Sequence, residues 1–209
     1  MCCMDKLDLA KAYRTYYTAP TNPQLVEFGS ISYVSILGQG DPNGDTFARA
    51  TEALYTIAYG VKGFYKKVEK DFTVAKLEGL WWVDGDPRLA LEVPREEWHW
   101  KLLIRMPDYV VAEKVEEARA SATIKKRELA IIADVQYEFL HEGTCVQMLH
   151  VGPYSTEPET LAQIEHFIAE QLLSYSGLHH EIYLSDPRKT EPAKLKTILR
   201  YPVQKAEVV

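Results

Sequence analysis

Hydrophobic and polar positions follow the same succession twice along the chain. Apolar runs typical of buried strands occupy ISYVSILGQG at 31–40 and CVQMLHVGPY at 145–154. Apolar residues at helical spacing follow the first run at Phe47, Ala50, Leu54, Ile57 and Val61, and the second at Leu161, Ile164, Phe167, Ile168 and Leu172. Each helix precedes another strand-like run, VAKLEGLWWV at 74–83 or HHEIYLSDP at 179–187. The pattern therefore predicts a strand, a helix and a strand in each half.

A further strand closes each half and indicates that the halves are related. KLLIRMP at 101–107 and KTILRYP at 196–202 share lysine, arginine and proline at an offset of 95 positions (196 − 101). The repeats then cover roughly residues 30–107 and 144–203, with a helical linker at 108–130. We predict an α+β fold in which tandem pseudo-twofold β-α-β-β repeats form one domain, residues 1–209, with a central ligand cleft.

Glu181 stands out in the otherwise apolar strand HHEIYLSDP. Because strand side chains alternate between faces, it shares a face with His179 and Tyr183. Burial of a carboxylate is costly unless a cation or a hydrogen-bond donor meets it. An ion pair with Arg200 of the following strand is one alternative, and a ligand is the other.

Aromatic residues near the predicted cleft favour a ligand. Aligning the halves makes Glu78 the counterpart of Glu181, Trp82 shares a face with Glu78, and Trp98 and Trp100 lie two apart. Aromatic faces attract cations, and a desolvated carboxylate adds Coulombic attraction. The predicted ligand-binding residues are Glu78, Trp82, Trp98, Trp100, Tyr154, Glu181 and Tyr183. Core packing of the tryptophans, and turn packing of Tyr154, are the alternatives.

Composition narrows the class of protein. The 209 residues are 46% hydrophobic and 26% charged with a net charge of −6, and no apolar run is long enough for a membrane span. The dispersed charge argues against a nucleic-acid partner, which calls for a concentrated basic face. The N-terminal MCCMDKLDLAK shows no secretory signal pattern, so we expect a cytoplasmic protein.

No metal or cofactor is expected. The cysteines form no C-x-x-C pair: Cys2 and Cys3 are adjacent, and Cys145 lies alone in an apolar run, where a buried strand residue is favoured over a nucleophile. His179 and Glu181 cannot chelate a metal together with His180, because neighbours in a strand point to opposite faces.

Three segments carry a family resemblance. EEWHWKLLIRMPDYV, CVQMLHVGPYSTEP and LHHEIYLSDPRKTEPAKLKTILRYPV resemble stand-alone members of the GyrI-like family of small-molecule-binding domains, over roughly residues 20–205. The resemblance implies a tandem β-α-β-β fold and kinship with the effector-binding halves of multidrug-responsive transcription activators. In those relatives a buried glutamate meets lipophilic aromatic cations, and it maps to Glu181. We therefore expect binding of lipophilic, planar aromatic, often cationic small molecules, without the DNA-binding domain of the activators.

The resemblance also implies an enzymatic alternative. Some stand-alone members hydrolyse the strained cyclopropane of DNA-alkylating natural products. In that case the same cleft would be catalytic, with Glu181 positioning or deprotonating water and Tyr183 or Tyr154 polarising the enone oxygen. A third alternative is an interaction protein that binds a peptide in the cleft.

Overall fold

The computed structural model describes residues 6–85 and 92–206, so Cys2 and Cys3 lie outside the described residues. The chain divides into two compact units. The first comprises Met1–Ala12 and Ile31–Leu140, and the second comprises Tyr13–Ser30 and His141–Val209. Both units combine helices with antiparallel strands, which confirms the expected mixture of α and β structure. Among the described helices, none is both long and apolar enough to cross a membrane.

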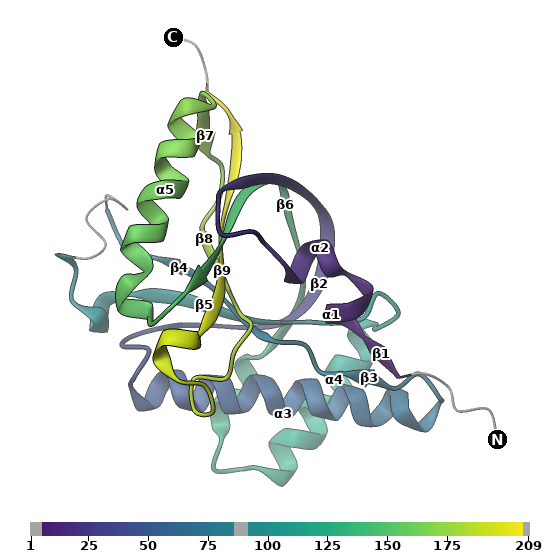
Figure 1. The fold of residues 1–209 in the computed structure, drawn as a ribbon. Helices are drawn as coiled ribbons and strands as arrows, with labels where there is room; N and C mark the ends of the chain where they lie inside the picture. Colours follow the sequence, from purple (N-terminus) through teal and green to yellow (C-terminus); the bar gives the residue numbers. More distant parts are fainter. Residues whose placement is uncertain (1–5, 86–91, 207–209) are drawn as a thin grey trace. The chain divides into compact units, whose positions relative to one another are not determined.

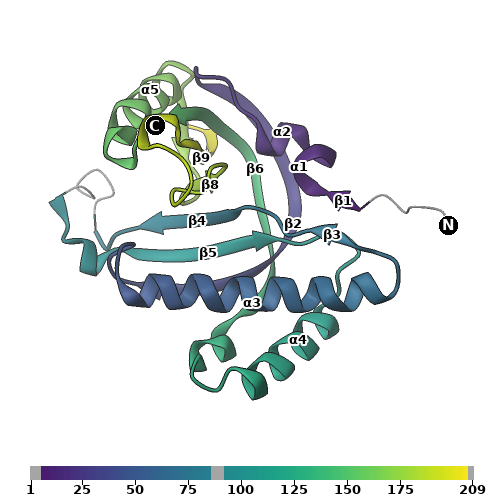
Figure 2. The same ribbon diagram turned by 60° about the horizontal axis from the view of Figure 1, so that its bottom comes forward.

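Three antiparallel strands carry the core of the first unit. They are β2 (Gln24–Gln39, in this unit from Ile31), β4 (Leu77–Trp82) and β5 (His99–Arg105), with β5 paired to both of the others. The long helix α3 (Asp45–Lys67) runs along β4 and β5, and α4 (Ala112–Lys125) packs against it (Figure 2). The shorter elements are β1 (Leu7–Asp8), α1 (Leu9–Ala12), β3 (Phe72–Thr73), η2 (Arg95–Glu97) and η3 (Ala130–Asp134).

Helix α3 forms where the sequence predicts it, and its apolar stripe is the reason it docks on the sheet. Ala50, Leu54, Ile57 and Val61 are all fully buried. They share one core with the sheet residues Val34, Ile36, Trp100, Leu102 and Ile104. Helix α4 lies within the segment 108–130 that the sequence predicts to be helical.

Strand β9 (Lys196–Lys205) is central to the second unit. It pairs antiparallel with β6 (Gln136–Val151), β8 (His179–Tyr183) and the short β7 (Leu173–Tyr175). Helix α5 (Glu157–Glu170) packs beside β7 and β9 (Figure 1). The core between them consists of Val146, Met148, Ile164, Ile168, Leu199 and Val203. The remaining elements are α2 (Arg14–Tyr17), η4 (Tyr154–Thr156) and η5 (Pro192–Lys194).

Helix α5 is shorter than the apolar spacing predicts. It ends at Glu170, and Leu172, which was expected on its apolar face, is 77% exposed with φ +52°. A residue in this left-handed conformation ends a helix and is usually glycine. The expectation was wrong at Leu172 because the backbone turns there and ends the helix, so its side chain does not join the apolar face.

Candidate functional site

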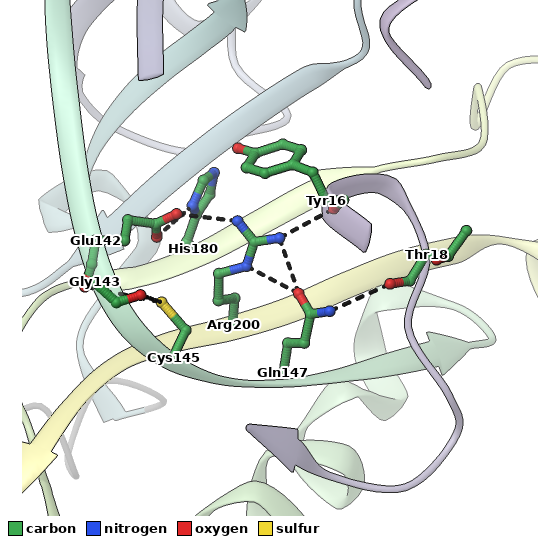
Figure 3. A network of polar contacts seen from close by, with 8 residues as sticks. All are labelled: Tyr16, Thr18, Glu142, Gly143, Cys145, Gln147, His180 and Arg200. Atoms are coloured by element: carbon green, nitrogen blue, oxygen red, sulfur yellow. Dashed lines mark hydrogen bonds and ion pairs between the residues drawn. The ribbon is translucent and has the colours of Figure 1, made fainter. Parts of the chain in front are cut away.

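Arg200 lies at the centre of a buried polar network in the second unit (Figure 3). Its guanidinium donates hydrogen bonds to Glu142 Oε2 at 3.0 Å, to Gln147 Oε1 at 2.9 and 3.1 Å, and to the Tyr16 carbonyl at 3.1 Å. The other oxygen of Glu142 lies 2.8 Å from Nδ1 of His180. Charges taken out of water are tolerated when they are paired in this way.

The electrostatics of this network fit a structural role. Burial alone would raise the pKa of Glu142, but the charges and hydrogen bonds of His180 and Arg200 outweigh it and lower the pKa to about 2. Burial raises the pKa of the nearby Cys145 thiol to about 12, which leaves it unreactive. Cys145 is therefore a buried strand residue, as favoured from the sequence.

The network excludes the ion pair between Glu181 and Arg200. Arg200 is paired in register with His180 and not with Glu181, so it lies on the other face of the strand pair. The two neighbouring histidines follow the same rule: His180 contacts Glu142, whereas Nε2 of His179 lies 3.1 Å from Oε1 of Glu181. Within the described residues, no group of histidines, cysteines and acids could hold a metal ion.

A second polar group surrounds Glu181 on its own face, and we call it the carboxyl cluster. Glu181 lies opposite Leu199, which belongs to the core beside α5, and its side chain is 14% exposed. The members of the cluster are Tyr154, Glu157, His179, Glu181, Tyr183, Thr197 and Tyr201. They come from η4, the first turn of α5, β8 and β9.

Glu157 is the most perturbed acid of the cluster. It is the first residue of α5, 8% exposed, and is hydrogen-bonded to Thr197. Burial, and then the negative charge of Glu181, raise its pKa to about 9. A helix N-terminus favours a carboxylate by up to ~2 kcal/mol, so these two effects outweigh the helix dipole. At neutral pH the pair therefore holds one proton on Glu157.

Tyrosines line the two carboxyl groups. The rings of Tyr154 and Tyr183 are 6.0 Å apart and meet edge to face, and the ring of Tyr201 lies 4.7 Å from that of His179. Burial, followed by the charges of Glu157 and Glu181, raises the pKa of Tyr154 to about 12. Its hydroxyl is therefore a hydrogen-bond donor across the physiological range.

Two polar atoms of the cluster have no hydrogen-bond partner among the described residues. Within the part of the chain that the structure describes, Oε1 of Glu157 and Nδ1 of His179 are buried and find no hydrogen-bond partner. Buried polar atoms without a partner are rare and costly. The cluster can therefore accept a cation or a hydrogen-bond donor between acidic and aromatic groups.

The other predicted ligand-binding residues belong to the first unit. Trp100 is fully buried and donates a hydrogen bond to the Gly40 carbonyl. It packs in the core, which was the alternative to ligand binding. Trp82 stacks on His99 at 5.4 Å. Trp98 precedes β5 and donates to the carbonyl of Val93. The ring of Trp100 also meets Phe47 of α3 edge to face at 5.3 Å.

Glu78 is not the positional counterpart of Glu181. It is fully buried and pairs in register with Leu103. The offset of 95 that relates the last strands takes Leu103 to Ile198, and Ile198 pairs with Ile182. The predicted equivalence is thus wrong by one residue, and one residue moves a strand side chain to the other face.

Two surface hollows are lined by other residues. One of about 410 Å³ is lined by residues of α4, among them Glu116, Arg119 and Ile124. Another of about 430 Å³ lies over α5, beside Pro23, His166 and Phe167. Neither includes a residue that the sequence predicts to bind a ligand.

Comparison with known proteins identifies the family. Residues 107–204 match the GyrI-like small molecule binding domain. The crystal structure of an uncharacterized conserved protein from Listeria innocua is 37% identical, covers 95% of this chain and 100% of that one, and superposes with a TM-score of 0.88. The chain belongs to the GyrI-like family. The predicted family resemblance is therefore confirmed.

Two further structures are similar to this GyrI-like domain. A hydrolase from Listeria innocua is 36% identical over 95% of this chain and 100% of its own, with a TM-score of 0.83. The C-terminal domain of EcmrR is 11% identical over 88% of this chain and 98% of its own, with a TM-score of 0.61, and shares the fold alone. The curated proteins give no significant match.

Sequence reasoning missed Glu157. A glutamate at the start of a helix is ordinarily explained by the helix dipole, so the position of Glu157 carries no hint of a site. The signal that could have revealed it is the break between the glycine-containing strand end VGPY and the helix, where Tyr154 was already a candidate. Only the fold brings this turn to Glu181.

Proposed function

We propose that this GyrI-like domain binds lipophilic, planar aromatic, often cationic small molecules, with Glu181 facing the ligand. The observation that carries the proposal is the carboxyl cluster, in which the buried Glu157, with an unsatisfied oxygen, and the partly buried Glu181 lie beside aromatic rings. No guanidinium shares this face of β8 in register with Glu181, because Arg200 serves the opposite face. The predicted tandem repeat and its ligand cleft are part of the proposal.

The tyrosines support a preference for aromatic cations. Tyr154 and Tyr183 meet edge to face at 6.0 Å, and Tyr154 lies close enough to Glu181 for its charge to act on the phenol. A cation over an aromatic ring gains ~0.5–2 kcal/mol, and the Coulombic attraction of a partly buried carboxylate adds to it. Trp82, Trp98 and Glu78 of the first unit stay predicted ligand contacts, whereas Trp100 packs in the core of that unit.

Charge selectivity tests this function. Ethidium, a fluorescent planar cation, should bind the wild-type protein with a dissociation constant on the order of micromolar. Phenanthridine, its uncharged parent ring, should bind about tenfold more weakly or worse, because it lacks the charge that Glu181 meets. Equal affinity for the two rings would contradict the role of the carboxylate.

One observation favours a second function, the hydrolysis of cyclopropyl enones. Burial raises the pKa of Glu157 to about 9, so this acid can donate a proton beside the second carboxyl group, that of Glu181, and acid–base catalysis requires such a pair. The Listeria innocua relative described as a hydrolase makes such an activity reasonable here. We propose that Glu181 takes a proton from a water molecule while the oxygen of that water bonds to a cyclopropane carbon. The electron pair of the broken C–C bond passes to the enone oxygen, which Glu157 or Tyr154 protonates.

Turnover separates this candidate from binding alone. The wild-type protein should convert an excess of a cyclopropyl-enone alkylator to its ring-opened water adduct, detected by mass spectrometry as a gain of one water. Glu181→Gln should lose this activity by about 100-fold or more, as expected when a general base is removed. Stoichiometric binding without the adduct would exclude the hydrolase.

A further inference from the structure

We infer that Glu157 is a second ligand-facing acid of the carboxyl cluster, and that a bound cation displaces the proton that Glu157 carries. The inference rests on the proposed binding of aromatic cations in this cluster. It adds a residue that the sequence does not point to, and it makes ligand binding dependent on pH.

The position of Glu157 supports contact with a ligand. Its side chain is more than nine-tenths buried, and its Oε1 finds no hydrogen-bond partner among the described residues. Its polar contact within the chain is Thr197, which lies opposite Tyr183 in the register of β8 and β9. A carboxyl group held by one hydroxyl, with one oxygen unsatisfied, is poised to bind an added group.

The groups that face Glu157 are acidic or neutral. From β8 it meets the charge of Glu181, from η4 the phenol of Tyr154, and from β9 the hydroxyl of Thr197. The ring nitrogens of His150 in β6 contact the Thr160 hydroxyl and the carbonyl of Pro153. Since the described groups acting on Glu157 supply no positive charge, the pair of acids keeps one proton in the absence of a ligand.

A cation changes this balance. It attracts both carboxyl groups, and the ionised form of Glu157 gains a partner for its unsatisfied oxygen. The O–H bond of Glu157 then breaks, its electron pair stays on the oxygen, and the proton passes to the solvent. Proton release and cation binding are thermodynamically linked. Because the cation lowers the pKa of Glu157, a higher pH strengthens binding of the cation by the same factor.

The expected pH dependence has a definite sign and limit. The pKa of Glu157 in the free protein is about 9, so below that pH each rise of one unit tightens ethidium binding by up to about tenfold. Above pH 9 the affinity becomes constant, because the free protein has already lost the proton. A ligand without charge leaves the proton in place and shows no such dependence.

Calorimetric titration with ethidium near pH 7 tests the inference. Binding measured in phosphate and in Tris, which differ in ionisation enthalpy, should reveal release of about one proton per ethidium. Glu157→Gln should abolish the release and flatten the pH dependence while it still binds ethidium. Glu159→Gln, which removes an exposed acid of the same helix, should behave as the wild type.

The outcomes separate this inference from the proposed function. If ethidium binds without proton release, the inference is overturned and the binding function stands. The same holds if Glu157→Gln releases as many protons as the wild type, and the proton then belongs to another group, such as His179. Failure of ethidium to bind at pH 6, 7 and 8 would refute the binding function itself, and the inference with it.

Discussion

Replacing Glu142 with glutamine should reveal how much of the stability depends on the buried network around Arg200. Glutamine keeps the size of the side chain and removes its charge, so Arg200 and His180 lose their buried counter-ion. The pKa of Glu142 is lowered from 4.5 to about 2, which corresponds to about 3 kcal/mol at about 1.4 kcal/mol per pH unit. Breaking a buried ion pair costs about 3–5 kcal/mol, so both routes give a similar magnitude.

Glu138 provides the matched control. Its ion pair with Lys101 has the same 3.0 Å length as that of Glu142 with Arg200, but both side chains are 32% exposed. Glu138→Gln should therefore cost about 0–1 kcal/mol. Urea unfolding followed by far-ultraviolet circular dichroism measures both free energies. Equal losses in the two variants would refute the reasoning that burial makes the Glu142 network strong.

The effect of Glu142→Gln should also depend on pH in one direction. A lowered pKa in the folded state contributes stability that is present above the ordinary value of 4.5 and is lost as the pH falls to about 2. The difference between variant and wild type should therefore be constant near neutral pH and shrink in strong acid.

Further changes test other parts of the structure. Glu157→Gln should raise the melting temperature at pH 8 and leave it unchanged at pH 4. The reason is that the raised pKa of Glu157 contributes stability below pH 4.5 that is lost as the pH rises to about 9. A uniform shift of the melting temperature at both pH values would contradict this. Gly38→Ala places a methyl group into the ring of Trp100 and should cost about 1–3 kcal/mol in urea unfolding, whereas Gly29→Ala, with open space around it, should cost less. Leu172→Gly should stabilise by about 1 kcal/mol, since glycine adopts φ +52° without strain; a loss of stability would show that the leucine side chain matters there.

Periodicity was sufficient to locate the principal helices and strands. The stripe from Ala50 to Val61 and the alternation in HHEIYLSDP depend on neighbours in the chain, so sequence alone could reveal them. Alternation also predicted correctly that His179 and His180 point to different faces.

What the sequence could not provide was the register and the long-range partners. The offset of 95 is well defined in the last strands, but a shift of one residue in the preceding strand separates Glu78 from Glu181. Likewise, the sequence offered Arg200 as an alternative partner of Glu181, but the pairing of β8 with β9 puts Arg200 on the face of Glu142. Glu157 became recognisable only through its burial beside a second acid.

The most direct test of the central claim compares Glu181→Gln with Glu159→Gln in their affinity for ethidium at pH 7. Both variants lose one negative charge from the second unit, but only the first loses it from the carboxyl cluster. Glu181→Gln should weaken binding by about tenfold or more, the usual loss when a charge-assisted contact is removed, and Glu159→Gln should leave it unchanged. Unaltered ethidium affinity in Glu181→Gln would contradict the claim that Glu181 is the ligand-facing charge of this GyrI-like domain.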